Sequence, residues 1–222
     1  MPTDVSVIPP TPSAEQFGAD ADRPLIEMSN DPVMLFKAWL GEATVAEPSD
    51  ANAMTLATVD ATGFPDARIV LLKDVSYSGF TFYTNYYSAK AQQLTANGAA
   101  ALLFHWKSTE RQVRVRGVVK LVAPEEADAY FAERARDSQI GAWASDQSQP
   151  LVTREALLGK VAMLKDLHKH DPAIERPPHW GGYRLVPSTI EFWQSQAFRL
   201  HDRRIYSVDA ASNQWVQARL SP

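Results

Sequence analysis

The chain contains no cysteine and no long apolar run. The lack of cysteine excludes disulfides, thiolate metal sites, iron–sulfur clusters and a cysteine nucleophile. Residues 99–104 form its longest apolar run, whereas a membrane-spanning helix needs roughly 20 apolar residues. The N-terminus also lacks the basic and apolar segments of a secretory signal. We therefore expect a cytoplasmic protein without a membrane partner.

Positive charge is not in excess either, because 22 Lys and Arg face 26 Asp and Glu. A protein that grips a nucleic-acid backbone normally has a surplus of basic residues, so we expect no nucleic-acid partner. Residues 1–30 hold five acids, one base and five of the 15 prolines. This composition predicts a disordered acidic, proline-rich tail, followed by a single domain at residues 31–222.

Common site signatures are missing as well. The chain has no Gly-x-Gly-x-x-Gly, Walker, Gly-x-Ser-x-Gly or His-Glu-x-x-His motif. His168 and His170 lie two residues apart in a predicted helix, so their side chains would point to different faces. We predict no metal site.

Alternating and helical hydrophobic patterns are present along most of the chain. Asp31 and Pro32 predict the start of a helix that ends near Gly41. Period-two patterns predict strands at residues 54–60, 67–73, 80–83, 99–106, 111–122, 182–186, 189–194, 203–208 and 215–220. Further helices are predicted at 88–97 with Ser88 as cap, 124–134, 137–144 and 153–168 with Thr153 as cap. The fold class is mainly β with peripheral helices, as an antiparallel barrel or strongly curled sheet.

Basic residues gather where these strands begin and end. Arg68 and Lys73 flank an apolar run, which from these residues alone is best explained by solvation of the strand ends; the alternative is an anion site. In the strand at 111–122, Gln112 shares one face with Arg114 and Arg116. An amide offers a donor and an acceptor, as the edge of a flavin or a base requires.

Two other groups favour an anionic ligand more strongly. Arg134 lies at a helix end, where a cation is favourable in any case, but Ser138 at the next helix start would complete a phosphate cradle. Arg199, His201 and Arg203 alternate onto one side of a predicted extended segment. Glu191 and Asp202 are available to pair with them, yet three such groups on one face are better explained by a bound anion.

These residues belong to longer motifs. Ile190-Glu191-Phe192-Trp193-Gln194, four residues, then Arg199-Leu200-His201-Asp202-Arg203 is the most specific. Supporting segments lie at 68–73, 82–85, 110–113, 136–143 and 180–182. From Asp31 to Pro222 the chain resembles the pyridoxine (pyridoxamine) 5′-phosphate oxidases. The resemblance implies an FMN-binding split β-barrel and a homodimer with FMN in clefts between the two chains.

The resemblance also implies roles for individual residues. FMN would be held by Arg68, Ile69, Val70, Leu71, Leu72, Lys73, Tyr83, Thr84, Lys90, Gln112, Gln147, Ser148, Trp193 and Arg203. The substrate would be bound by Lys73, Tyr130, Arg134, Ser138, Arg199 and His201. Arg199 and His201 would lie at the reacting carbon as the catalytic residues.

The implied reaction oxidises pyridoxamine or pyridoxine 5′-phosphate to pyridoxal 5′-phosphate and reduces oxygen to hydrogen peroxide. The alternative is a flavin- or B6-binding split-barrel protein without oxidase activity. This chain departs from the family pattern at Ala89, where Ser-Arg-Lys-Ala is usual, and it lacks an Arg-Arg-x-Tyr segment near its N-terminus. The loss of a charged hydrogen bond at position 89 predicts FMN binding about ten- to a hundredfold weaker.

Overall fold

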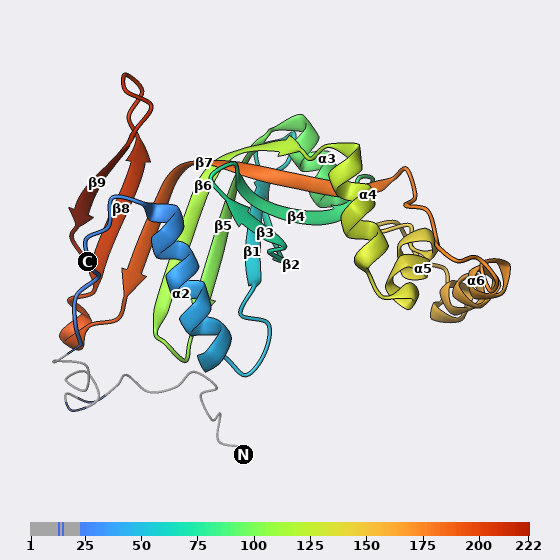
Figure 1. Ribbon diagram of the computed structural model, residues 1–222, viewed down its shortest axis with the longest axis horizontal. Helices are drawn as coiled ribbons and strands as arrows, with labels where there is room; N and C mark the ends of the chain where they lie inside the picture. The colour runs from blue at the N-terminus through green and yellow to red at the C-terminus, as the bar shows by residue number, and fades with distance from the viewer. Residues whose placement is uncertain (1–12, 14, 16–22) are drawn as a thin grey trace, which may run out of the picture.

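A single antiparallel sheet organises the part of the chain that the computed structural model describes, residues 13, 15 and 23–222 (Figure 1). Its nine strands follow the order β2-β1-β5-β6-β7-β4-β3, and β8 pairs with β7 and with β9. The strands are β1 (Ala53–Val59), β2 (Pro65–Leu71), β3 (Asp74–Ser76), β4 (Gly79–Asn85), β5 (Ala99–Trp106), β6 (Arg111–Leu121), β7 (Trp180–Gln194), β8 (Asp202–Val208) and β9 (Trp215–Leu220). The sheet curls into a half-barrel, which confirms the predicted fold class.

Strand β7 differs from the prediction of two separate strands at 182–186 and 189–194. It runs without a break through Pro187 and pairs with β6 along its length, with a register shift opposite Arg116 and Gly117. Its other edge pairs with β4 only as far as Leu185 and with β8 only from Thr189. Proline has no N–H to donate, and Pro187 lies in the interval where that edge has no neighbouring strand, so it does not interrupt the sheet.

Helix α2 (Pro32–Ala46) packs against one face of the sheet (Figure 1). Asp31 accepts hydrogen bonds from Val33 and Met34, as expected of a cap. The Phe36 ring meets Phe80 edge-on at 4.9 Å, within a core of interdigitating aromatic side chains. The prediction that this helix ends near Gly41 is wrong, because the helix stops only where a proline follows Glu47.

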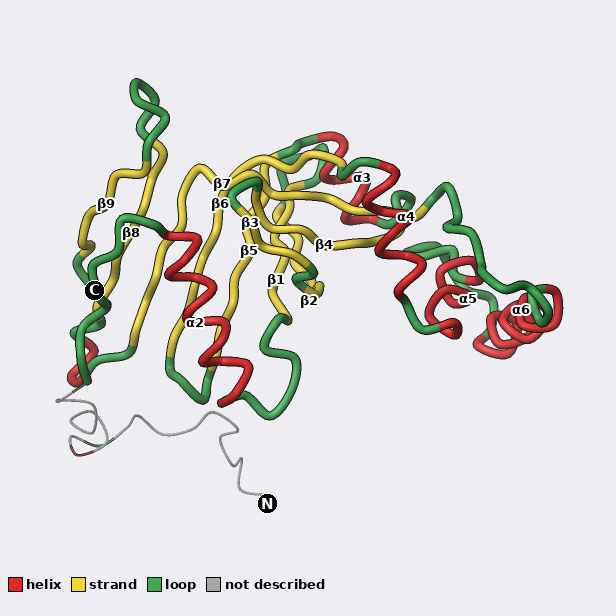
Figure 2. Tube along the Cα trace, viewed as in Figure 1, coloured by secondary structure: helices red, strands yellow, loops and turns green. Residues whose placement is uncertain are grey.

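The other helices gather at the end of the sheet that lies away from β8 and β9 (Figure 2). They are α3 (Ala89–Ala96), α4 (Pro124–Glu133), α5 (Arg136–Ala144) and α6 (Arg154–Leu167). Thr153 caps α6 by accepting from the Ala156 N–H. Ser88 occupies the cap position of α3 without capping it, because its hydroxyl donates to the Asn85 carbonyl instead. Within the described part of the chain, no helix is long and apolar enough to cross a membrane.

The predicted disordered tail is wrong for residues 23–30. These residues form no helix or strand, but the Ile26 N–H donates to Asp202 Oδ2 at 2.8 Å, and the Ile26 side chain is buried. Arg204 Nε donates to the Ile26 carbonyl and the Tyr206 hydroxyl to the Ser29 carbonyl. Residues 1–12, 14 and 16–22 lie outside the described part of the chain. The segment before α2 is thus fixed along β8.

Candidate functional site

A cavity of about 690 Å³ opens where β2 and β4 meet α3, α4 and α5. This volume is typical of small-molecule and cofactor sites. The cavity brings together eleven residues that the sequence analysis singled out: Ile69, Val70, Leu71, Lys73, Tyr83, Thr84, Lys90, Tyr130, Arg134, Ser138 and Gln147. They come from five distant segments of the chain, so the fold unites most of the predicted site.

Three parallel aromatic rings line one wall of the cavity. The Tyr83 ring stacks on Tyr130 with 4.1 Å between centroids and on Trp180 with 5.3 Å. Burial, then the charge of Glu126, raises the pKa of Tyr83 to about 12, so its phenol stays protonated at neutral pH. Strand β7 reaches this wall through Gly182, where an added Cβ would lie 2.8 Å from Tyr83 Cε1. The glycine therefore allows the close approach that the stack requires.

The first cationic cluster in the cavity consists of Lys73, Arg134 and Ser138. Arg134 caps the end of α4, and its guanidinium lies 4.6 Å from the Trp180 ring centroid. Its Nη2 donates to the Ser138 carbonyl at 3.1 Å, and Lys73 Nζ lies 5.9 Å from the Tyr130 ring centroid. Burial lowers the pKa of Arg134, but an arginine remains charged at neutral pH. The cluster is suited to an anionic group.

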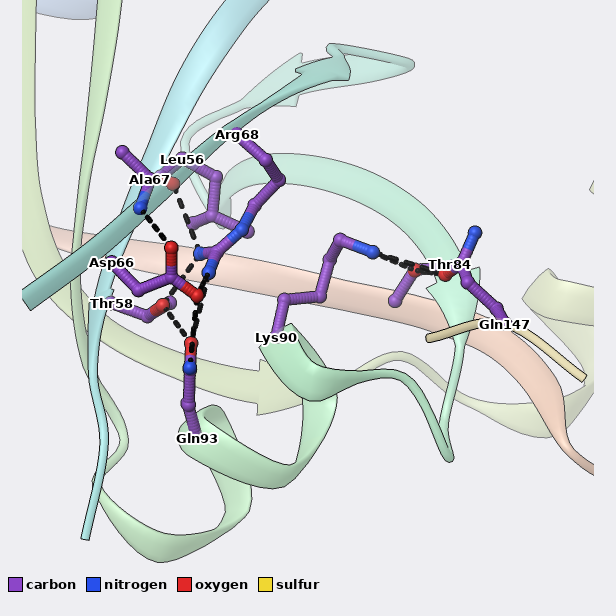
Figure 3. Close-up of polar contacts among 9 residues, drawn as sticks. All are labelled: Leu56, Thr58, Asp66, Ala67, Arg68, Thr84, Lys90, Gln93 and Gln147. Atoms are coloured by element: carbon purple, nitrogen blue, oxygen red, sulfur yellow. Dashed lines mark hydrogen bonds and ion pairs between the residues drawn. The ribbon is translucent and has the colours of Figure 1, made fainter. Parts of the chain in front are cut away.

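The second cationic cluster centres on Lys90, in the first turn of α3 (Figure 3). Lys90 Nζ donates to Gln147 Oε1 at 3.0 Å and to Thr84 Oγ1 at 3.3 Å. Burial, then the charge of Arg68, lowers the pKa of Lys90. Both acceptors are neutral, so this cation also retains the capacity to attract an anion.

Three predicted cofactor residues lie beside this cavity rather than in its wall. Arg68 turns toward Thr58, Asp66 and Gln93. The Leu72 side chain is buried in the hydrophobic core, because neighbouring residues of an extended segment point to opposite faces. Ser148 lines a smaller adjoining cavity, together with Gln147.

The remaining predicted site residues lie elsewhere on the sheet. Gln112, Trp193 and Arg203 are direct cross-strand neighbours on β6, β7 and β8, so their side chains share one face. Arg203 donates through Nε and Nη2 to Glu191 Oε1 at 3.0 and 2.7 Å. None of the three lines the cavity of the same chain. Their contact with a cofactor stays a prediction.

Arg199 and His201 also lie away from that cavity, and the predicted extended segment is wrong there. A short 3-10 turn covers Ala197–Arg199, in which Phe198 and Arg199 have φ of 54° and 61°. The His201 ring lies 4.5 Å from the Trp193 ring, so the turn brings His201 back to the β7 face. The Gln196 N–H donates to His201 Nδ1 at 3.2 Å. The proton of the neutral imidazole is therefore on Nε2, and burial, then Arg199, lowers the pKa of His201.

Six residues of the cavity wall received no role from the sequence: Asn85, Gly141, Ala142 and Trp180, which lie in the quoted motifs, and Ala135 and Ser145, which lie outside them. Trp180 was quoted in the motif at 180–182 but received no role; its place next to two glycines was the available signal.

His168 Nδ1 lies 2.8 Å from Asp171 Oδ2. Among the described residues, no three potential metal ligands cluster.

Comparison with known proteins identifies the family to which this fold belongs. The family model for pyridoxamine 5′-phosphate oxidase matches residues 40–168. A second model, for the pyridoxine 5′-phosphate oxidase C-terminal dimerisation region, matches residues 180–222. The chain belongs to the pyridoxamine 5′-phosphate oxidase family. This membership confirms the resemblance stated from the motifs and the prediction of an FMN-dependent oxidoreductase.

Curated relatives of the family match over almost their entire length. The pyridoxine/pyridoxamine 5′-phosphate oxidase of Hyphomonas neptunium is 56% identical over 98% of this chain and 99% of its own. That of Caulobacter vibrioides is 53% identical over the full length of both chains. Among solved structures, PhzG from Burkholderia lata, in complex with tetrahydrophenazine-1-carboxylic acid, is 32% identical with a TM-score of 0.84 and covers 91% of this chain and all of its own. Relatives with this fold thus include a protein bound to a different ligand.

Proposed function

We propose that this oxidase-family member oxidises pyridoxamine 5′-phosphate and pyridoxine 5′-phosphate to pyridoxal 5′-phosphate. The C4′ amine or alcohol becomes the aldehyde; the amine substrate takes up water and releases ammonia, and oxygen takes the two electrons and becomes hydrogen peroxide. FMN, when bound, would supply the acceptor for the hydride from C4′. The names of the relatives that match the full chain support these substrates.

The observation that carries the proposal is the presence of two separate cationic clusters in one cavity. Arg134 and Lys73 form one, and Lys90 with Thr84 and Gln147 forms the other. Two phosphate-bearing molecules, the cofactor and the substrate, require two such clusters. The stacked rings of Tyr83, Tyr130 and Trp180 line the same cavity and offer a flat surface to the rings of both molecules. The donor set and the volume therefore fit FMN next to a pyridine phosphate.

Arg199 and His201 act, in this proposal, at the cavity of the other subunit of a homodimer. They belong to the segment that matches a dimerisation region, and they do not line the cavity of their own chain. His201 would present Nε2–H to the substrate, because the Gln196 N–H occupies Nδ1. Arg199 would orient the pyridine ring and accommodate charge as the hydride leaves. Holding the substrate carbon against the acceptor is the main task of these residues.

The visible absorption spectrum tests the activity directly. The purified holoenzyme is mixed with pyridoxamine 5′-phosphate without oxygen and is then exposed to air. We expect the flavin band to bleach on mixing and to recover in air as pyridoxal 5′-phosphate and hydrogen peroxide form. A flavin band that does not change would contradict the proposal and support the alternative, a flavin- or B6-binding protein without oxidase activity. Bleaching by a reduced tricyclic acid but not by the vitamer would support a reaction on the kind of ligand found with PhzG.

Hybrid dimers test the shared site. Arg199→Leu should lower kcat about a hundredfold or more while FMN content stays unchanged, and Arg134→Met should impair substrate binding. Mixing the two variants after dissociation should restore about a quarter of the wild-type activity, because half of the dimers are hybrids with one complete site each. If Arg199 acts in its own chain, the mixture stays as inactive as the variants. Equal loss of turnover and of FMN from Arg199→Leu would also refute its assigned role.

A further inference from the structure

The Gln93 side chain forms hydrogen bonds with both a cation and an anion in a network next to the Lys90 cluster (Figure 3). Its Oε1 accepts from Arg68 Nη2 at 2.9 Å and from Thr58 Oγ1 at 2.5 Å. Its Nε2 donates to Asp66 Oδ2 at 3.0 Å. The amide thus holds a cation through its oxygen and an anion through its nitrogen. A leucine of similar size would offer neither the acceptor nor the donor, and asparagine, which carries the same amide, is one methylene shorter.

Arg68 is held on both of its terminal nitrogens. Nη1 donates to the Leu56 carbonyl at 3.1 Å and to Thr58 Oγ1 at 2.5 Å. Nη2 donates to Gln93 and, at 2.5 Å, to Asp66 Oδ2. Thr58 is only 2% exposed, so one anchor of the network is fixed in the core. A guanidinium with partners on both terminal nitrogens is confined to one orientation.

Arg68 and Lys90 are close enough for the charge of one to affect the other, since Arg68 contributes to the lowered pKa of Lys90. Gln93 follows Lys90 by three residues on α3, so one short helix carries both the lysine and the residue that fixes the arginine. Asp66 neutralises only one of the two cations. Holding like charges together costs free energy unless an anion binds to them.

We propose that Gln93 is a positioning residue of the cofactor site, which fixes the Arg68 guanidinium through Nη2 so that its Nε–H and Lys90 together bind the phosphate of FMN. The inference rests on the proposed function. With Ala89 where an arginine is usual, the phosphate site of this chain would depend all the more on these two cations. Gln93 itself would not touch the cofactor.

The test compares FMN with riboflavin, which lacks only the phosphate. Both are titrated into the full-length protein after removal of its flavin, and binding is followed by quenching of flavin fluorescence. Gln93→Leu should weaken FMN binding about tenfold, as expected for a charged hydrogen bond that is no longer well oriented, and should change riboflavin binding less than about twofold. Gln92→Leu is the matched control, since the neighbouring Gln92 is exposed and donates only to the Tyr87 carbonyl.

A second variant guards against a folding defect in the first. Gln93→Glu keeps an acceptor for Arg68 but removes the donor to Asp66 and adds a negative charge, so it should also weaken FMN selectively. Equal weakening of FMN and riboflavin, or normal FMN binding by both variants, would overturn the inference. Wild-type protein that binds neither flavin would instead overturn the proposed function. Normal FMN binding by the variants of an otherwise active enzyme would refute the role of Gln93 alone.

Discussion

The phenol rings of Tyr83 and Tyr130 lie almost parallel, with an angle of 19° between their planes. Tyr83 comes from β4, next to the edge strand β3, and Tyr130 from α4, so this contact joins the helical end of the molecule to the sheet. The ring of Trp180, the first residue of β7, stacks on Tyr83 and also lies 6.1 Å from the Tyr130 ring, so each of the three rings contacts the other two. The wall of the cavity is therefore also a structural joint.

The raised pKa of Tyr83 predicts a loss of stability at alkaline pH. Its pKa is about 12 in the folded protein and about 10 in an unfolded chain. Between these values the unfolded chain has lost the proton that the folded protein keeps, so stability falls as the pH rises. Urea unfolding at pH 9 and pH 11 should show a larger loss for the wild type than for Tyr83→Phe. Equal losses in the two proteins would contradict the pKa assignment.

Arg134→Met predicts a selective defect in substrate binding. The substitution removes the cation over Trp180 and the donor to Ser138. KM for pyridoxamine 5′-phosphate should rise about tenfold or more, as expected for a lost charged contact, while the FMN dissociation constant changes less than about twofold. Arg136→Met is the control, because that guanidinium donates to the His168 carbonyl at the surface. A similar rise in KM for both variants would argue against a substrate phosphate at Arg134.

Ala89→Arg predicts tighter cofactor binding. Ala89 is the exposed first residue of α3, next to Lys90. A guanidinium there would add a charged hydrogen bond to the FMN phosphate, worth about 1.5 to 3 kcal/mol, so the dissociation constant should fall about ten- to a hundredfold. Ala96→Arg places the same side chain at the far end of the helix and should have no such effect. An unchanged FMN dissociation constant in Ala89→Arg would refute the prediction.

Asp202→Ala predicts the release of the segment before α2. The buried carboxylate accepts from the Ile26 N–H and pairs with Arg219 at 3.1 Å. Its removal leaves a buried donor without a partner and should cost about 2 kcal/mol. Hydrogen exchange at the Ile26 amide should accelerate accordingly. Asp137→Ala, which breaks only a surface ion pair with Lys165, should change the free energy of unfolding by less than about 1 kcal/mol; equal effects of the two substitutions would contradict this view.

Local sequence signals predicted most elements, and the errors have local physical causes. Asp31 and Thr153 were recognisable caps because a side-chain oxygen next to an apolar period is a short-range signal. Pro187 led to the wrong prediction of two separate strands. Its effect depends on which edge of the strand has a neighbour, and only the assembled sheet determines that. Phe198 and Arg199 adopt positive φ, which non-glycine side chains disfavour and which tertiary contacts must impose. Such contacts cannot be read from spacing.

The candidate site was predictable where motifs supplied its residues and unpredictable where packing did. Lys73, Lys90 and Arg134, all named from the motifs, line one cavity. Gln93 was missed as a partner of Arg68, because it lies 25 residues away in the sequence and carries no unusual pattern. Likewise, nothing local indicated that the core would bury the Leu72 side chain. The resemblance supplied residue roles, whereas the hydrogen-bond network required coordinates.

Strand β7 has 15 residues and connects Trp180, in the cavity wall, with Trp193, beside His201. At about 3.3 Å per residue, this one strand would set the spacing between the two groups of residues that the proposed shared site brings together in a dimer. The number of residues in β7 therefore determines this spacing. If the site is shared as proposed, an inserted or deleted residue in β7 would shift both active sites of the dimer at once. The sheet already accommodates one such irregularity, at the register shift beside Pro187.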